Sequence, residues 1–115
     1  MKLSLAIGCT VAAGVLVNGL ALAQTDASKL GTMHFETSCK PDAQKAFDRG
    51  MLYQHSFWYR ASQQEFEKAL TIDPECGIAY WGIALSLLLN PHVPTPAKNL
   101  AEGATVIAKG KSVGA

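Results

Sequence analysis

Two stretches of the sequence match each other when one of them is shifted by 34 residues. The shift pairs large residues with large ones and a small residue with another small one: Phe47 with Trp81, Tyr53 with Leu87, Gly50 with Ala84. A repeat of this length is typical of chains built from similar supersecondary units, none of which can bury its apolar face alone. The sequence is therefore expected to form stacked units.

Hydrophobic spacing indicates that these units are helical, so we expect an all-α fold. Prolines mark where helices begin, because the first turn of a helix does not need the missing N–H. The Asp73–Pro74 pair ends one helix and starts the next. The four expected helices run from residue 41 to about 55, 59 to about 71, 75 to about 89, and 96 to about 109.

The third expected helix is apolar on nearly all sides, and a helix of that kind must be covered by other parts of the fold. A stiff proline-rich loop, residues 90–96, separates it from the fourth helix. The four helices would pair into two antiparallel hairpins over residues 41–110, followed by a short tail at 111–115.

The first 23 residues have the features of a secretory signal peptide. Lys2 is followed by an apolar run and by Ala21-Leu22-Ala23, a small-x-small cleavage pattern. We expect cleavage after Ala23 and a periplasmic or secreted protein, with an uncleaved membrane anchor as the alternative. Residues 24–40 show no sustained period and are expected to form an irregular lead-in.

Composition excludes several classes of function. The chain has ten Lys and Arg residues against nine Asp and Glu, a net charge of +1, and only 17% charged residues. Nucleic-acid binding needs a basic surface that this balance does not supply. After cleavage of the signal peptide no membrane association is expected.

The first predicted hairpin resembles the tetratricopeptide repeat, a 34-residue helix–turn–helix unit. The matching positions are Gly50, Tyr53, Phe66, Ala69 and Pro74, with Ser62 in place of another small residue. Ala46 and Arg49 depart from the Trp and Leu of the pattern. The resemblance implies an α-solenoid, and it covers roughly residues 42–109.

The resemblance also implies a function as a protein–protein interaction scaffold, with no enzymatic activity and no cofactor. Its partner would be a protein or peptide bound in a groove lined by the first helix of each hairpin. By matching position, the groove residues would be Gln44, Phe47, Met51, Gln54, His55, Ile78, Trp81 and Leu85. The alternative is that Trp81 and Leu85 are core residues covered by further repeats.

Two repeats are fewer than the three that such arrays normally need for stability. The chain is therefore expected to be part of a longer exported protein. Self-association of the two-repeat stack is the alternative, because apolar residues of the fourth helix would otherwise lie exposed.

Cys39 and Cys76 lie just before the first helices of successive repeats, at the same end of the stack. In an oxidising compartment they are candidates for a disulfide, which would tie the lead-in to the second repeat. Two buried thiols are the alternative.

The remaining candidate chemistry is weaker. His34, His55 and His92 have no metal-ligand spacing, so no metal site is expected. The aromatic segment His55–Tyr59 lies in the turn between the first two helices. Its residues could plug the end of the hairpin, or they could form the site of an exported small-ligand or metal-binding protein, which is our second functional hypothesis.

Overall fold

A computed structural model describes residues 27–113, and within them the chain is all-helical, as predicted. The predicted signal peptide lies outside the described residues. A short 3-10 helix precedes four α-helices: η1 (Ala27–Leu30), α1 (Pro41–His55), α2 (Tyr59–Ile72), α3 (Gly77–Leu87) and α4 (Ala97–Val113).

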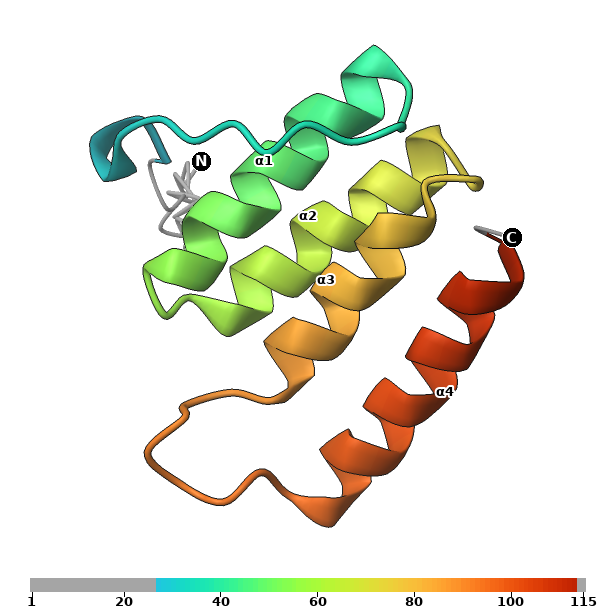
Figure 1. Cartoon of the computed structure of the whole chain (residues 1–115). Coiled ribbons are helices and arrows are strands. Elements are labelled where there is room, and N and C mark those ends of the chain that lie inside the picture. The colour runs from blue at the N-terminus through green and yellow to red at the C-terminus, as the bar shows by residue number, and fades with distance from the viewer. Residues whose placement is uncertain (1–26, 114–115) are drawn as a thin grey trace, which may run out of the picture.

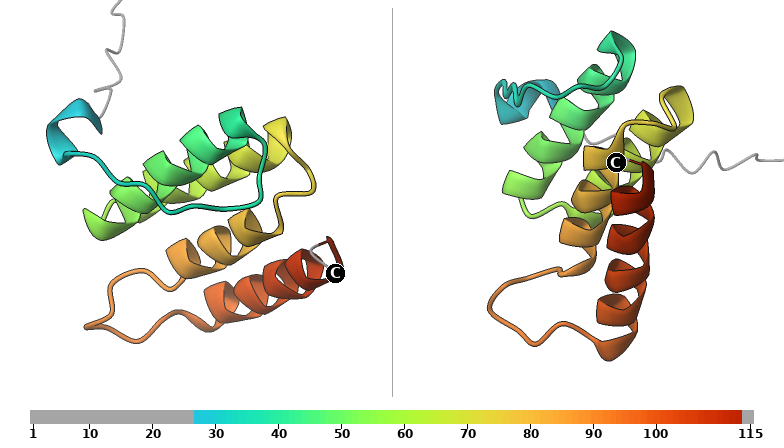
Figure 2. Two further views of the ribbon diagram at one scale, coloured as in Figure 1. Left: turned by 45° about the horizontal axis from the view of Figure 1, so that its top comes forward. Right: turned by 45° about the vertical axis from the view of Figure 1, so that its right-hand side comes forward.

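The helices pack in chain order (Figure 1). α1 pairs with α2, α2 with α3 and α3 with α4, while α3 also touches α1. Figure 2 shows the two hairpins from further directions, with α4 at the edge farthest from α1. The residues before α1 run back across this helix as an extended segment.

α1 and α2 begin and end close to the predicted positions, whereas α3 is shorter than predicted. α3 begins later than predicted, at Gly77. The Asp73 carboxylate accepts a hydrogen bond from the backbone N–H of Glu75 at 3.3 Å, and this bond stabilises a turn before the helix. At its other end Leu89 has a φ of 61°, a left-handed conformation that ends the helix. The side chain of Asn99 then binds the Leu87 carbonyl at 3.0 Å.

α4 continues to Val113, three residues into the predicted tail. Gly110 lies against Tyr80, and a Cβ at this glycine would be only 2.7 Å from the Cβ of Tyr80. The missing side chain therefore lets the last turns of α4 pack closely on α3. Lys109 adds a cation–π contact with the same tyrosine, 5.5 Å from its ring centroid.

The ring of Phe66 fills the space where α1, α2 and α3 meet. A Cβ at Gly50 would lie 2.6 Å from Cε1 of this ring, and a Cβ at Gly82 would lie 2.6 Å from its Cγ. Phe66 is completely buried and packs against Phe47, with ring centroids 5.2 Å apart. The two glycines thus make room for the ring, one on each neighbouring helix.

Buried hydroxyl groups join the same three helices beside Phe66. The Ser62 hydroxyl donates to the Gly50 carbonyl at 2.9 Å, and the Ser86 hydroxyl donates to Ser62 at 2.9 Å. Oε1 of Gln54 lies 3.1 Å from both hydroxyl oxygens and is an alternative acceptor for either proton. Small hydroxyl side chains allow close helix packing while satisfying their own polar atoms.

Arg49, one of the departures from the repeat pattern, does not disturb this core. Its guanidinium forms an ion pair with Glu65 of α2 at 3.0 Å, at the side of the hairpin. The side chain is half-exposed, so the interaction contributes little to stability.

The substitutions Gly50→Ala and Gly82→Ala are expected to destabilise the protein by about 1–3 kcal/mol each, because the added methyl group would overlap the Phe66 ring. Gly103→Ala is the matched control, since a Cβ there would meet its nearest atom at 3.9 Å. This helical substitution should stabilise the protein by up to about 1 kcal/mol. Urea unfolding measures all three. Equal effects at the three glycines would contradict the proposed packing.

Candidate functional site

The first-hairpin part of the predicted groove is not open. Phe47 is completely buried and Met51 nearly so, and both belong to the same apolar cluster as Ala79 and Ile83 of α3. The prediction that Phe47 and Met51 face a partner is therefore wrong. These side chains fill the contact between the hairpins instead.

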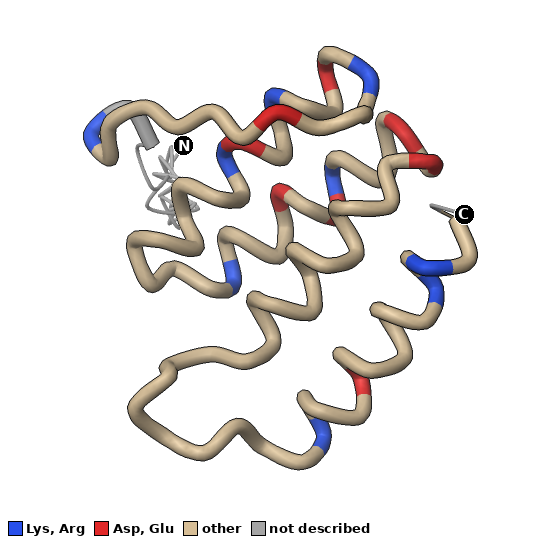
Figure 3. Tube along the Cα trace, in the orientation of Figure 1, with Lys and Arg blue, Asp and Glu red and all other residues tan. Residues whose placement is uncertain are grey.

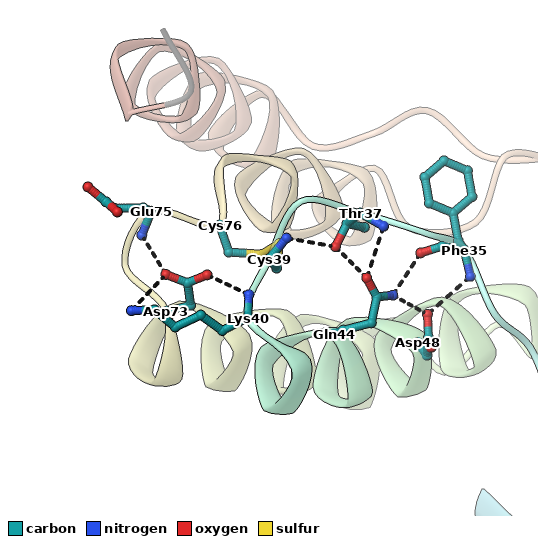
Figure 4. The surroundings of a disulfide bond; sticks show 9 residues. All are labelled: Phe35, Thr37, Cys39, Lys40, Gln44, Asp48, Asp73, Glu75 and Cys76. Atoms are coloured by element: carbon teal, nitrogen blue, oxygen red, sulfur yellow. Dashed lines mark hydrogen bonds and ion pairs between the residues drawn. A yellow bond between two sulfur atoms is a disulfide. The ribbon is translucent and has the colours of Figure 1, made fainter.

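An extended segment covers the remaining face of α1. We call this segment, residues 31–40, the strap (Figure 4). The Gln44 side chain holds its backbone: Nε2 donates to the Phe35 carbonyl at 2.7 Å, and Oε1 accepts from the Thr37 N–H at 2.9 Å. The Asp48 carboxylate accepts the Phe35 N–H at 3.1 Å. Gln44 is therefore occupied by the protein's own chain.

The other predicted groove residues of α1 are divided between core and surface. Gln54 is half-buried, and its Oε1 contacts the buried hydroxyl groups of Ser62 and Ser86. His55 is exposed at the end of α1. The structure thus places the predicted α1 residues in three different environments.

A disulfide joins the strap to the start of α3. Cys39 and Cys76 have a Cα–Cα distance of 4.8 Å and an S–S distance of 1.95 Å, and Cys76 is almost completely buried. The bond closes a loop with a sequence separation of 37 residues. By the chain-entropy relation such a loop contributes about 4 kcal/mol to stability.

Asp73 anchors the strap beside the disulfide. Its carboxylate accepts the backbone N–H of Lys40 at 2.9 Å, and the Lys40 ammonium lies 3.6 Å away. The hydrogen bond from the Lys40 N–H is the main reason that the pKa of Asp73 is lowered. The folded protein therefore holds this carboxylate in its charged form.

The second hairpin has an open apolar groove, which we call the α3/α4 groove. It has a volume of about 310 Å³, and Trp81, Leu88 and Leu100 on its walls are 39%, 45% and 51% exposed. Its full lining is Trp81, Ala84, Leu85, Leu88, Asn99, Leu100, Gly103, Ala104 and Ile107. Figure 3 shows that α3 carries no charged residue here, while the charges of α4 lie towards its ends and on Glu102.

A second hollow continues the groove towards the end of the strap. It shares Trp81 and Ile107 with the α3/α4 groove, and it reaches Ile78, Glu75 and Lys111. Three of the predicted groove residues, Ile78, Trp81 and Leu85, are thus brought together on one surface. Leu100 was not among the predicted groove residues, although the apolar spacing of Leu100, Ala104 and Ile107 along one helix face was a signal for it.

α4 of the second hairpin carries a smaller residue than Phe66 at the corresponding position. In the first hairpin this ring faces Gly50, and the residue 34 positions after Gly50 is Ala84. The residue of α4 that faces Ala84 is Gly103. Gly103 thus corresponds to Ser62, which contacts Gly50 in the first hairpin, and Ile107, four residues further on, corresponds to Phe66.

The aromatic turn is partly structural and partly exposed. Trp58 stacks on Tyr53, with ring centroids 5.7 Å apart, and this contact closes the end of the first hairpin. Phe57 has a φ of 61° and is 66% exposed. Within residues 27–113 no group of three or more His, Cys, Asp or Glu side chains is arranged to hold a metal ion.

None of the helices in the described part of the chain is long and apolar enough to cross a lipid bilayer. No protein-family model matches the chain, and no curated protein or solved structure shows a significant match to it.

Loss of the disulfide is expected to lower the free energy of unfolding by about 4 kcal/mol. The single variants Cys39→Ser and Cys76→Ser and the double variant should lose similar amounts, as measured by urea unfolding without reductant. Alkylation of the unreduced unfolded wild type, read by peptide mass, should leave both cysteines unmodified. Alkylation of both without reductant would contradict the disulfide.

Asp73→Asn is expected to destabilise the protein in a pH-dependent way. Because folding lowers the pKa of Asp73, the ionised carboxylate stabilises the folded state above the ordinary Asp pKa, and this stabilisation is lost as pH falls through the folded pKa. Urea unfolding should show a wide gap between wild type and variant at neutral pH, closing in acid.

Asp42→Asn is the control, since Asp42 pairs with Lys45 on the exposed surface and salt screens that pair. A gap for Asp73→Asn that stays constant from neutral to acidic pH would contradict the role given to the carboxylate.

Proposed function

We propose that this protein is an exported protein–protein interaction module built from two tetratricopeptide-like hairpins. The single observation that carries the proposal is the open apolar α3/α4 groove. Contiguous exposed apolar surface of this kind is typical of binding sites, because it is unfavourable in contact with water.

The packing of the helices supports the comparison with a solenoid. α3 lies against both helices of the first hairpin, and α3 and α4 then form a second hairpin. The close approach at Gly50 and Ser62 uses two of the positions on which the sequence resemblance rests.

Two independent features support export. The sequence begins with a basic residue, an apolar run and a small-x-small pattern, as secretory signals do. The Cys39–Cys76 disulfide requires an oxidising environment to persist.

The composition of the groove supports a partner protein. Trp81 lines both the groove and the hollow that continues it, and tryptophan is enriched among residues that dominate binding energy at protein interfaces. The surrounding Leu88, Leu100 and Ile107 supply apolar area that a partner would remove from water.

The proposal is tested by affinity capture from a periplasmic extract with wild type and with Leu100→Asp. We expect a specific protein to be retained by the wild type and lost, at least about tenfold, with the charge in the groove. Thr105→Asp is the control, because Thr105 is exposed on the same helix but outside the groove lining. Capture that is the same for all three proteins, or absent from all, would contradict the proposal.

A further inference from the structure

We propose that one end of the helix stack docks on the surface of an anionic phospholipid bilayer. This end, which we call the loop end, consists of the turn between α1 and α2 (residues 56–58) and the loop between α3 and α4 (residues 88–96). Figures 1 and 2 show both connections at the same end of the helices, opposite the turn between α2 and α3. The inference adds a second surface to the proposed function and does not rest on it.

The loop end is apolar and exposed to solvent. Its large exposed apolar side chains are Phe57, Trp58, Leu88, Leu89 and Val93. Leu89 and the segment from Phe57 to Ala61 line one shallow hollow of about 530 Å³, so the turn and the start of the loop form one surface. Helices that extended the stack would cover α4, whereas the loop end lies at the side of the stack (Figure 2). Further stacking therefore does not account for these apolar residues.

Two of these residues hold a backbone conformation that glycine adopts at lower cost. Phe57 and Leu89 both have a φ of 61°, and each stands just after the end of a helix, where a left-handed residue is usually glycine. A bulky side chain is unfavourable in this conformation. Because both side chains are exposed, burial within the fold does not offset that cost. Contact with an apolar phase outside the fold would offset it.

The backbone of the loop end is prepared to leave water. The N–H group of each of the five apolar residues donates to a backbone carbonyl at 3.3 Å or less. Phe57 and Trp58, for example, donate to the carbonyls of Gln54 and Tyr53 at 3.2 and 2.9 Å. An unpaired N–H is costly in lipid, which supplies no hydrogen bonds in place of water. A lipid surface therefore fits this end, because these five residues require no polar groups from their partner.

The charges of the loop end favour an anionic surface. Arg60 is the only Lys, Arg, Asp or Glu among residues 50–64, and Lys98 is the only one among residues 76–101. Arg60 also lines the hollow beside Phe57. Figure 3 shows no acidic residue on either connection. Basic residues near an anionic membrane strengthen attachment, and tryptophan prefers the membrane interface.

This inference differs from the expectation that the mature chain does not associate with a membrane. That expectation used the net charge of the whole chain, which averages over all surfaces. The fold instead separates the acidic residues from the loop end, and it brings together apolar residues that lie about 30 positions apart in the sequence.

Vesicle co-sedimentation of the mature protein tests the proposal. Vesicles of phosphatidylcholine alone are compared with vesicles of equal amounts of phosphatidylcholine and phosphatidylglycerol, at low and high salt. We expect preferential binding to the anionic vesicles, weakened at high salt because salt screens Arg60 and Lys98. In a Trp81→Phe background, which leaves Trp58 as the only tryptophan, the fluorescence emission should shift to shorter wavelength as vesicles bind.

The double variant Phe57→Gly/Leu89→Gly separates membrane contact from folding. Glycine suits a φ of 61°, so the variant should unfold at the same or a higher urea concentration than the wild type. Its affinity for the anionic vesicles should nevertheless fall at least about tenfold. Arg60→Gln should lower this affinity about fivefold. Leu100→Ala, in the α3/α4 groove, is the uncharged control and should bind like the wild type.

Failure of the wild type to bind the anionic vesicles would overturn the proposal, as would equal binding to both kinds of vesicle. Full binding by the double glycine variant would contradict it too, and so would loss of binding in Leu100→Ala, because the groove would then contact the lipid. A dimer in solution that the double glycine variant abolishes would assign the loop end to a second copy instead. Partner capture that depends on Leu100 is a separate result, so the proposed function can stand if the lipid surface is refuted.

Discussion

The insertion of Phe66 between Gly50 and Gly82 is the contact on which the rest of this structure depends. It sets how closely three helices approach, and it positions the hydroxyl groups of Ser62 and Ser86 within reach of each other. The second hairpin keeps an open groove, and the apolar side chains of Trp81, Leu88 and Leu100 on its walls are exposed.

The two hairpins therefore present different binding chemistries. The face of α1 holds an extended segment through side-chain hydrogen bonds to its backbone, and the disulfide fixes that segment in place. The groove of the second hairpin is apolar and offers almost no hydrogen bonds. One face is thus filled by the protein itself, whereas the other is an apolar surface that is open to solvent.

The fold class and the boundaries of α1 and α2 could be predicted from the sequence because they depend on local signals, such as proline positions and helical spacing. The burial of Phe47 could not be predicted, because it depends on the strap, which crosses α1, and on α3, which packs from the other side. The same holds for Gln44, whose partners are backbone groups of an aperiodic segment.

The accessibility of Trp81 tests the central claim most directly. Acrylamide quenching of its fluorescence, in a Trp58→Phe background, reports whether the groove of the second hairpin is open. The account predicts efficient quenching in the free protein, comparable to that of a half-exposed indole, and strong protection once a partner is bound. A Trp81 that is already protected in the monomeric free protein would contradict it.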